Sequence, residues 1–306
     1  MRRHHMSPSS VAACAAALSI LLPATATVSA RPPEQAHGAR IAILASAVDA
    51  SGSPVQDLKP TDLLAKVESS GATISGVSRV GAPAQIVVLV DSSSNPSRGP
   101  QKMVWNAQCV AALAEQLPTV KNFVVLGFSD HIAEIYSGPA NASKIESAVK
   151  NAPRAGECAL LEVMKYMGDT LMQQGNGDPT ILVVVSDGVD TVSRASSKDV
   201  IRSVGMAGVP VYSLIVMDPS WSTQNLSKLN ARGKLMDISK ATGGTSISLN
   251  PGEVKKMAGT IGSLLDGRYM VEISGVTLKS NSESRLTLDS QRAGIQLYHA
   301  DFLYNR

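Results

Sequence analysis

Two apolar segments of this chain each end in an aspartate. Residues 86–90 are all branched aliphatic, and so are residues 181–185. The second segment runs through Ser186 into Asp187. The first segment runs into a polar cluster made of Asp91, Ser92, Ser93, Ser94 and Asn95. Carboxylate and hydroxyl oxygens are the donors that a hard cation such as Mg²⁺ prefers, so the two segment ends predict one shared cation site.

The apolar segments predict two central strands of a parallel sheet. A continuous apolar run suits a strand that is covered on both faces. In open α/β sheets, ligand sites lie just beyond the carboxyl ends of such strands. An alternative role for Asp91 and Asp187 is to cap the helices that follow, since Asp is a preferred N-cap residue. The same arrangement at two strand ends favours the shared site.

Strands and helices alternate along the middle of the chain. The hydrophobic pattern predicts strands at residues 85–90, 122–129, 180–186, 210–216 and 245–248, and helices at about 99–117, 142–150, 158–173, 195–206, 228–241 and 251–265. Gly243 and Gly244 stop one helix before the last of these strands. The alternation predicts an α/β fold with a doubly wound, mostly parallel sheet.

At the two aspartates the chain resembles the von Willebrand factor A-type (VWA) domain, the fold shared with integrin I domains. The resemblance covers about residues 82–266. The metal-ion-dependent adhesion site of that family uses Asp-x-Ser-x-Ser after the first core strand, a Thr in a later loop and an Asp after the fourth strand. Asp91, Ser93 and Asp187 match three of these positions. The resemblance therefore implies a Mg²⁺ or Mn²⁺ site that a carboxylate of a protein partner completes.

Two positions depart from the family pattern. Asn95 stands where the second Ser belongs, and Cys158 stands where the Thr belongs. An Asn side-chain carbonyl can still bind a hard cation, although it is longer than Ser. A thiol is a soft donor and a poor ligand for Mg²⁺, so the direct contact made by Thr is expected to be lost. The sequence leaves a metal-bridged site and a metal-free scaffold open.

Trp221 is the aromatic residue best placed to contact a partner. It lies in a loop after the strand predicted at 210–216, on the edge that carries the two aspartates. Aromatic residues at such an edge are frequent interface anchors. A tryptophan that folds back onto its own loop is the alternative.

The two flanks of the chain alternate apolar and polar residues at a strand period. Residues 40–81 and 267–306 each offer too few strands to bury a core of their own. Both flanks resemble those of a bacterial family of secreted VWA-related proteins. That resemblance implies a small β-sandwich appendage built from both ends of the chain. Residues 31–39 are predicted to be a polar tether before it.

The amino terminus has the pattern of a signal peptide spanning residues 1–30. Arg2 and Arg3 precede an apolar stretch, and small residues lead up to a cleavage point after Ala30. Lipidation at Cys14 is the less favoured alternative, because the apolar region follows this cysteine. No later segment is long and apolar enough to cross a bilayer. We expect an exported, soluble protein in the periplasm or outside the cell.

Charge and cysteine content narrow the function further. Without residues 1–30 the chain keeps 26 basic and 25 acidic side chains, since only two of its 28 basic residues are removed. No Lys/Arg cluster appears, which argues against binding to nucleic acid or to an anionic membrane.

Cys109 falls inside a predicted helix and Cys158 in the site loop. Two buried free thiols are therefore expected in preference to a disulfide.

Enzymatic function finds little support in the residue pattern. The serines near Asp91 lie in no Gly-x-Ser-x-Gly elbow and have no Ser-x-x-Lys partner. His131 follows a predicted hairpin turn, where an exposed histidine is the simpler interpretation than a catalytic base. The sequence predicts an exported protein-binding module that docks a protein partner at the carboxyl edge of its sheet. A metal-free scaffold and, from a different class, a secreted hydrolase are the alternatives.

Overall fold

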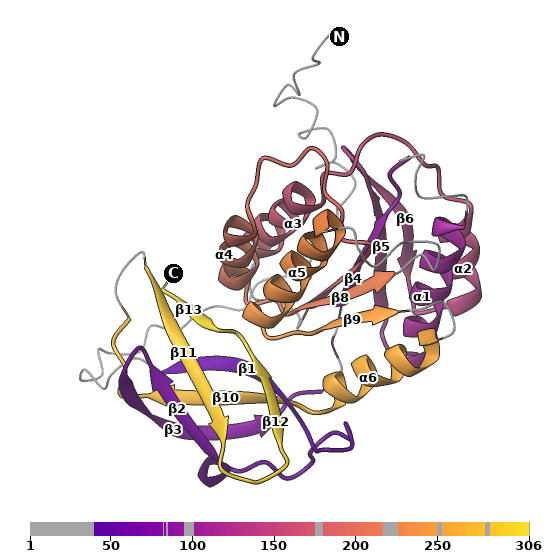
Figure 1. The fold of residues 1–306 in the computed structure, drawn as a ribbon. Helices are drawn as coiled ribbons and strands as arrows, with labels where there is room; N and C mark the ends of the chain where they lie inside the picture. The colour runs from indigo at the N-terminus through magenta and orange to yellow at the C-terminus, as the bar shows by residue number, and fades with distance from the viewer. Residues whose placement is uncertain are drawn as a thin grey trace, which may run out of the picture.

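The computed structural model describes two β-sheets, and one helix, residues 254–266, leads from one sheet into the other (Figure 1). The described residues are 40–81, 83, 85–94, 101–174, 180–216, 226–249, 253–278 and 282–305. One sheet has six strands flanked by helices, and the other has seven strands drawn from the two ends of the chain. Among the described residues, no helix is long and apolar enough to cross a membrane.

The six-stranded sheet is the doubly wound sheet expected from the sequence. Its strand order is β6-β5-β4-β7-β8-β9. The strands are β4 (Gln85–Asp91), β5 (Asn122–Phe128), β6 (Ile132–Gly138), β7 (Thr180–Ser186), β8 (Val211–Val216) and β9 (Ser246–Leu249). All neighbours run parallel except β5 and β6, which form an antiparallel hairpin at one edge. The carboxyl ends of β4 and β7 therefore lie next to each other.

Helices cover both faces of this sheet (Figure 1). They are α1 (Lys102–Gln116), α2 (Ala142–Lys150), α3 (Leu160–Gln174), α4 (Ser197–Ala207), α5 (Leu226–Ala241) and α6 (Val254–Asp266). Residues of α1, α2 and α6 form the core on one face, while residues of α3, α4 and α5 form the core on the other.

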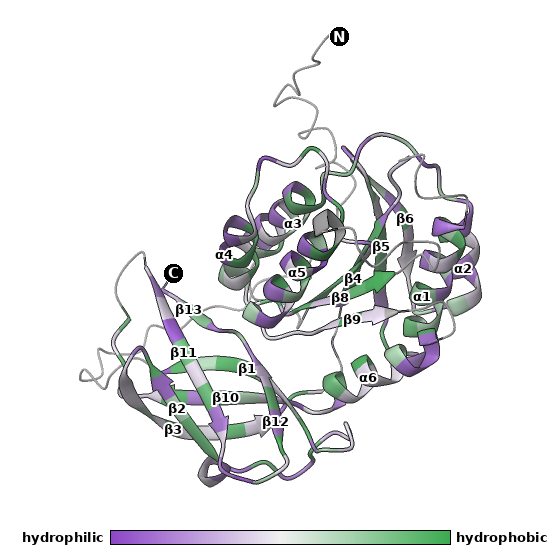
Figure 2. Ribbon diagram, viewed as in Figure 1, coloured by the Kyte–Doolittle hydropathy of each residue, from purple (hydrophilic) through white to green (hydrophobic). Residues whose placement is uncertain are grey.

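Strand β4 shows why a continuous apolar run was needed. Ile86 and Val88 belong to the core shared with α1, whereas Val87 and Leu89 belong to the core shared with α3. Because successive side chains of a strand point to opposite faces, a strand covered on both sides has no polar position. Figure 2 accordingly shows the central strands of the six-stranded sheet as largely hydrophobic.

The Gly243-Gly244 pair ends α5 for two different physical reasons. Gly243 has a φ of +85°, a left-handed conformation that favours glycine after a helix. Gly244 has no room for a side chain, because a Cβ atom there would lie 1.9 Å from the carbonyl oxygen of Val211. The chain can therefore turn from α5 into β9 tightly against the start of β8.

The seven-stranded sheet is antiparallel and combines both flanks of the chain. It contains β1 (Ile41–Val48), β2 (Leu63–Val67), β3 (Ser70–Arg79), β10 (Arg268–Ser274), β11 (Glu283–Ser290), β12 (Gln296–His299) and β13 (Phe302–Tyr304). Its order is β12-β1-β10-β3-β2-β11-β13, so strands from the two flanks are interleaved. The sheet curls, and its buried side chains form a third core. This arrangement confirms the expected appendage.

The appendage is joined to the helical part by backbone contacts. Gly267, directly after α6, accepts a 2.8 Å hydrogen bond from the amide of Ala47 in β1. The amide of Asp301 donates a 2.9 Å hydrogen bond to the carbonyl of Ala241 at the end of α5. Val48 of β1 belongs to the core that α1 and α6 share. The two parts of the chain are thus packed against each other.

Candidate functional site

Asp91 is the last residue of β4, and its side chain is buried. Its main-chain carbonyl accepts a 3.1 Å hydrogen bond from the Asn106 amide on α1. The next residue, Ser92, donates from both its amide (2.9 Å) and its hydroxyl (3.0 Å) to the carbonyl of Phe128, the last residue of β5. These contacts fix the chain where it leaves the sheet. The Asp91 carboxylate therefore has one defined position at the carboxyl edge.

Hydroxyl groups from two strand ends converge on that carboxylate. Asp91 Oδ1 accepts hydrogen bonds from the Ser93 amide at 3.0 Å and from the Ser93 hydroxyl at 2.7 Å. Asp91 Oδ2 accepts a 3.2 Å hydrogen bond from the Ser186 hydroxyl at the end of β7. The Cys158 sulfur lies 3.8 Å from the same oxygen. The adjacency of the two strand ends that the sequence predicted is thus present in the structure.

Lys102 is the site residue that sequence reasoning missed. Its ammonium lies 2.5 Å from Asp91 Oδ1 and donates a 3.1 Å hydrogen bond to the Ser93 hydroxyl. The residue is only 7% exposed although it carries a charge. It is also the first residue of α1, where the helix dipole disfavours a cation. The only signal in the sequence was that a lysine follows the polar cluster of residues 91–95, and that signal does not say that its side chain is buried against Asp91.

Asp187 is also buried, and its carboxylate holds a turn. Its Oδ1 atom accepts a 2.9 Å hydrogen bond from the amide of Val189. Gly188 between them has a φ of +83° and donates its amide to the Ser186 hydroxyl at 3.1 Å. Asp187 thus fixes the chain just after β7, on the same edge as Asp91.

Neither aspartate caps a helix. The N-cap position of α1 is held by Gln101 and that of α4 by Ser196. The capping alternative for Asp91 and Asp187 is therefore wrong. Both carboxylates instead bond to amides two residues further along the chain, which stabilises the turns that leave β4 and β7.

The loop that carries Cys158 joins the site from the side. The Cys158 amide donates a 3.0 Å hydrogen bond to the Thr191 hydroxyl, and the Thr191 amide donates a 2.8 Å hydrogen bond to the Cys158 carbonyl. Cys158 is 1% exposed, so its thiol faces the interior.

Asn95 and Trp221, the other two predicted site residues, lie outside the described residues.

Both cysteines in the described part of the chain are buried thiols that form no disulfide, as expected from the sequence. Burial raises the pKa of the Cys109 thiol to about 12. The thiol of Cys109 therefore stays protonated at neutral pH and packs as a small apolar group in the core beside α1.

A serine, an aspartate and a histidine meet beside the site at the β5–β6 turn. His131 Nδ1 lies 3.0 Å from the Ser129 hydroxyl and 2.9 Å from Asp130 Oδ1. The hydrogen bond from His131 is the largest cause that lowers the pKa of the Asp130 carboxyl. A catalytic relay uses the two ring nitrogens for different partners, whereas here one nitrogen faces both. The cluster stabilises a turn and does not form a triad.

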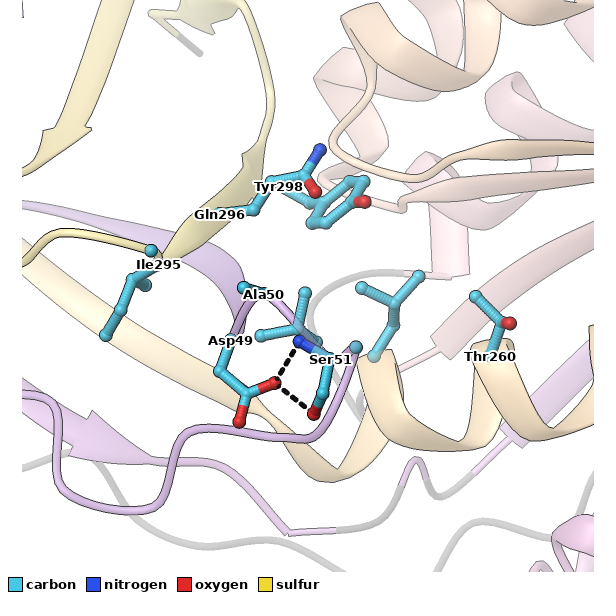
Figure 3. Close-up of a pocket in the computed structure, with 11 residues that line it drawn as sticks. Asp49, Ala50, Ser51, Thr260, Ile295, Gln296 and Tyr298 are labelled. Atoms are coloured by element: carbon cyan, nitrogen blue, oxygen red, sulfur yellow. Dashed lines mark hydrogen bonds between the residues drawn. The ribbon is translucent and has the colours of Figure 1, made fainter.

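A cavity of about 480 Å³ lies elsewhere, between α6 and the appendage (Figure 3). Its lining contains no residue from the loops after β4, β5 or β7. The carboxylate of Asp49 in its wall accepts hydrogen bonds from the Ser51 amide at 2.8 Å and the Ser51 hydroxyl at 2.6 Å. Asp49 thus holds its own turn together, and this cavity does not share the chemistry of the Asp91 site.

A divalent ion does not fit the contacts around Asp91. Mg²⁺ binds its oxygen ligands at about 2.1 Å. Asp91 Oδ1 and the Ser93 hydroxyl, the first two ligand positions expected from the sequence, both contact the Lys102 ammonium.

Comparison with known proteins identifies one family. The model of the von Willebrand factor type A domain matches residues 85–265. No curated protein has a sequence that matches this chain.

Among solved structures, a von Willebrand factor type A protein from Catenulispora acidiphila is similar at 10% identity and a TM-score of 0.47, covering 85% of this chain and 72% of that one. Proximal thread matrix protein 1 from the mussel byssus, with a zinc-occupied MIDAS motif, is 16% identical with a TM-score of 0.46. That match covers 62% of this chain and 49% of the mussel protein. The pilus adhesin SpaC from Lactobacillus rhamnosus GG is 11% identical with a TM-score of 0.45, covering 81% and 48%. The chain thus spans about half the length of the latter two proteins.

Proposed function

The chain belongs to the von Willebrand factor type A domain family, and we propose on that basis that it is a protein-binding module whose partner docks at the carboxyl edge of the six-stranded sheet. One observation carries the proposal. Asp91 and Asp187 lie at the ends of the neighbouring strands β4 and β7, where ligands of open α/β sheets bind, and the Ser186 hydroxyl donates to Asp91 across the two strand ends. The protein therefore has an ordered polar platform at this edge, which supports the proposal that a partner docks there.

The exposed residues around this platform give it the character of a protein interface. We define the docking rim as the exposed residues Ser94, Asp130, His131, Glu157, Thr191 and Arg194. Both signs of charge and two hydroxyl groups are present, which suits the polar rim of a protein interface. The rim comes from the loops after the neighbouring strands β5, β4 and β7 and from the loop between α2 and α3 that carries Glu157. A partner at this edge would contact all of these loops.

A hydrolytic function has weaker support. The Ser129, Asp130 and His131 cluster provides a nucleophile and a base by residue type. However, Ser129 is 1% exposed and shares one histidine nitrogen with the aspartate. A substrate could not reach the hydroxyl without unfolding the turn. We therefore propose that the protein binds its partner without chemical conversion.

Photo-crosslinking tests where the partner docks. Glu157 on the rim is replaced by a photoreactive amino acid, and Lys121, which is exposed just before β5 at the opposite edge, is the matched control. We expect a discrete protein adduct from position 157 alone, and excess wild-type protein should compete it away. Equal adducts from both positions, or an adduct from position 121 alone, would contradict docking at the rim.

We also propose that the protein is exported and cleaved after Ala30, because the first 30 residues have the layout of a signal peptide. Protein recovered from the producing cells should begin at Arg31, as measured by amino-terminal sequencing or intact mass. A chain that retains Met1 would contradict export by this signal. An acylated chain that begins at Cys14 would instead establish membrane anchoring.

A further inference from the structure

We propose that the Lys102 ammonium permanently occupies the cation position of the Asp91 site, so that this member of the family works without a divalent metal. The claim that Lys102 occupies the cation position is argued from the geometry alone. The claim that the partner docks without a metal rests in addition on the proposed function. The two parts are tested separately below.

The first step is the placement of the ammonium. Lys102 Nζ lies 2.5 Å from Asp91 Oδ1 and 3.1 Å from the Ser93 hydroxyl. These are the two groups that a metal at this site would need first. An ion about 2.1 Å from both oxygens on the side where the ammonium lies would overlap it, and an ion on any other side would lie close to a like charge. Metal and lysine therefore compete for these two oxygens.

The second step is electrostatic. Asp91 is 0% exposed, and a buried carboxylate requires a positive partner or a set of hydrogen bonds. The ammonium supplies one positive charge and up to three hydrogen-bond donors, whereas a metal ion would supply two charges. Lys102 is itself buried at the first turn of α1, where the helix dipole disfavours a cation. The two opposite charges thus stabilise each other, and hydrogen bonds from Ser93 and Ser186 add to the stabilisation of Asp91.

The third step concerns Cys158. Its thiol lies 3.8 Å from Asp91 Oδ2, where the family pattern expects a threonine hydroxyl. A thiol is a poor ligand for a hard cation, but it is a weak donor to a carboxylate. It is therefore compatible with a site whose cation is an ammonium. Two independent changes, a lysine in place of the ion and a thiol in place of a hydroxyl, agree with the same interpretation.

The consequence for docking follows from the chemistry of the two cations. A metal ion offers open coordination positions to a carboxylate of the partner. The buried Lys102 ammonium directs its donors at Asp91 and Ser93. We therefore expect the partner to be held by the rim itself, with no metal bridge. Chelators should leave the complex intact.

Titration with Mn²⁺ and Mg²⁺ after treatment with a chelator tests the occupation. In calorimetry, wild-type protein should bind neither ion at millimolar concentration, and neither ion should raise its melting temperature. Lys102→Ala uncovers the two oxygens, so it should bind Mn²⁺ at least about tenfold more tightly than wild type, and its melting temperature should rise with Mn²⁺. Adding Cys158→Thr should tighten the binding further. Lys121→Ala, which removes an exposed lysine at the opposite edge, is the control and should gain nothing.

Three outcomes decide the proposal. Metal binding by wild-type protein that Asp91→Asn abolishes would overturn it, and so would a folded Lys102→Ala variant that still ignores both ions. If Lys102→Ala does not fold, amine acylation of native wild-type protein replaces it. Lys102 should then stay unmodified while Lys121 reacts, and rapid modification of Lys102 would refute its burial in the site.

The docking consequence has its own readout. The adduct formed from position 157 should be unchanged in excess chelator. Loss of that adduct in chelator would refute metal-free docking. Absence of the adduct under all conditions would refute the proposed docking rim, while the metal titration would still decide whether Lys102 occupies the cation position.

Discussion

Asp91→Ala should lower the free energy of unfolding by about 3–5 kcal/mol. The substitution leaves the Lys102 ammonium buried without its carboxylate and leaves the Ser186 hydroxyl without its acceptor. Removing one partner of a buried ion pair is costly, because the charge that remains is shielded from water and no longer has an opposite charge beside it. Urea denaturation at neutral pH, followed by circular dichroism, measures the change.

Removal of both charges should cost much less than removal of one. In the double variant Asp91→Ala with Lys102→Met, no buried charge is left, so most of the lost stability should return. Lys165→Ala is the matched control, since its 2.7 Å pair with Asp169 has half-exposed partners and should be worth at most about 1 kcal/mol. The comparison also needs the single variant Lys102→Met. If the stability lost in the double variant equals the sum of the losses in the two single variants, Asp91 and Lys102 are not energetically coupled.

The sequence predicted the central strands well because their burial leaves a simple pattern. Strand β4 must be apolar from Ile86 to Val90, since Val88 faces one core and Leu89 the other. The polar residues that follow can only lie at the strand end. The convergence of Asp91 with Ser186 then follows from the parallel pairing of β4 with β7.

Lys102 could not be predicted in the same way. The helix that carries it was expected to begin near residue 99, which would place Lys102 inside the helix, where lysines normally face solvent. Only the packing of α1 against β4 turns this side chain toward Asp91.

The strand β6 was implied as half of a hairpin, but its half-buried sequence has no apolar run that would mark its bounds.

The appendage shows a different limit of sequence reasoning. Period-two alternation identified strands in both flanks, but it does not say which strands pair. Strand β10 lies between β1 and β3, so a strand from the carboxyl-terminal flank is inserted between two strands from the other flank. That order depends on contacts between residues far apart in the chain, such as Val271 with Val77. No local signal in either flank encodes it.

This interleaving makes the two flanks dependent on each other. Deletion of residues 1–81 removes β1, β2 and β3, so β10 loses both neighbours and β11 loses β2. Side chains of the third core and the backbone edges of the remaining strands would be exposed to solvent. We expect this variant to aggregate, which size-exclusion chromatography would show as loss of the monomer peak.

A protein trimmed to residues 82–266 should behave differently, because both cores of the doubly wound sheet stay within it. It loses Val48 from the core beside α6 and the contact of Gly267 with Ala47, so it should fold with reduced stability. Thermal unfolding would show one cooperative transition at a lower temperature than that of the longer chain. The opposite result would be an insoluble trimmed protein and a stable, monomeric single-flank deletion. It would mean that the helical part needs the appendage in order to fold, whereas the appendage does not need both of its flanks. In that case the packing of β1 on α6, and not the pairing of the flanks, would be the contact that holds the molecule together.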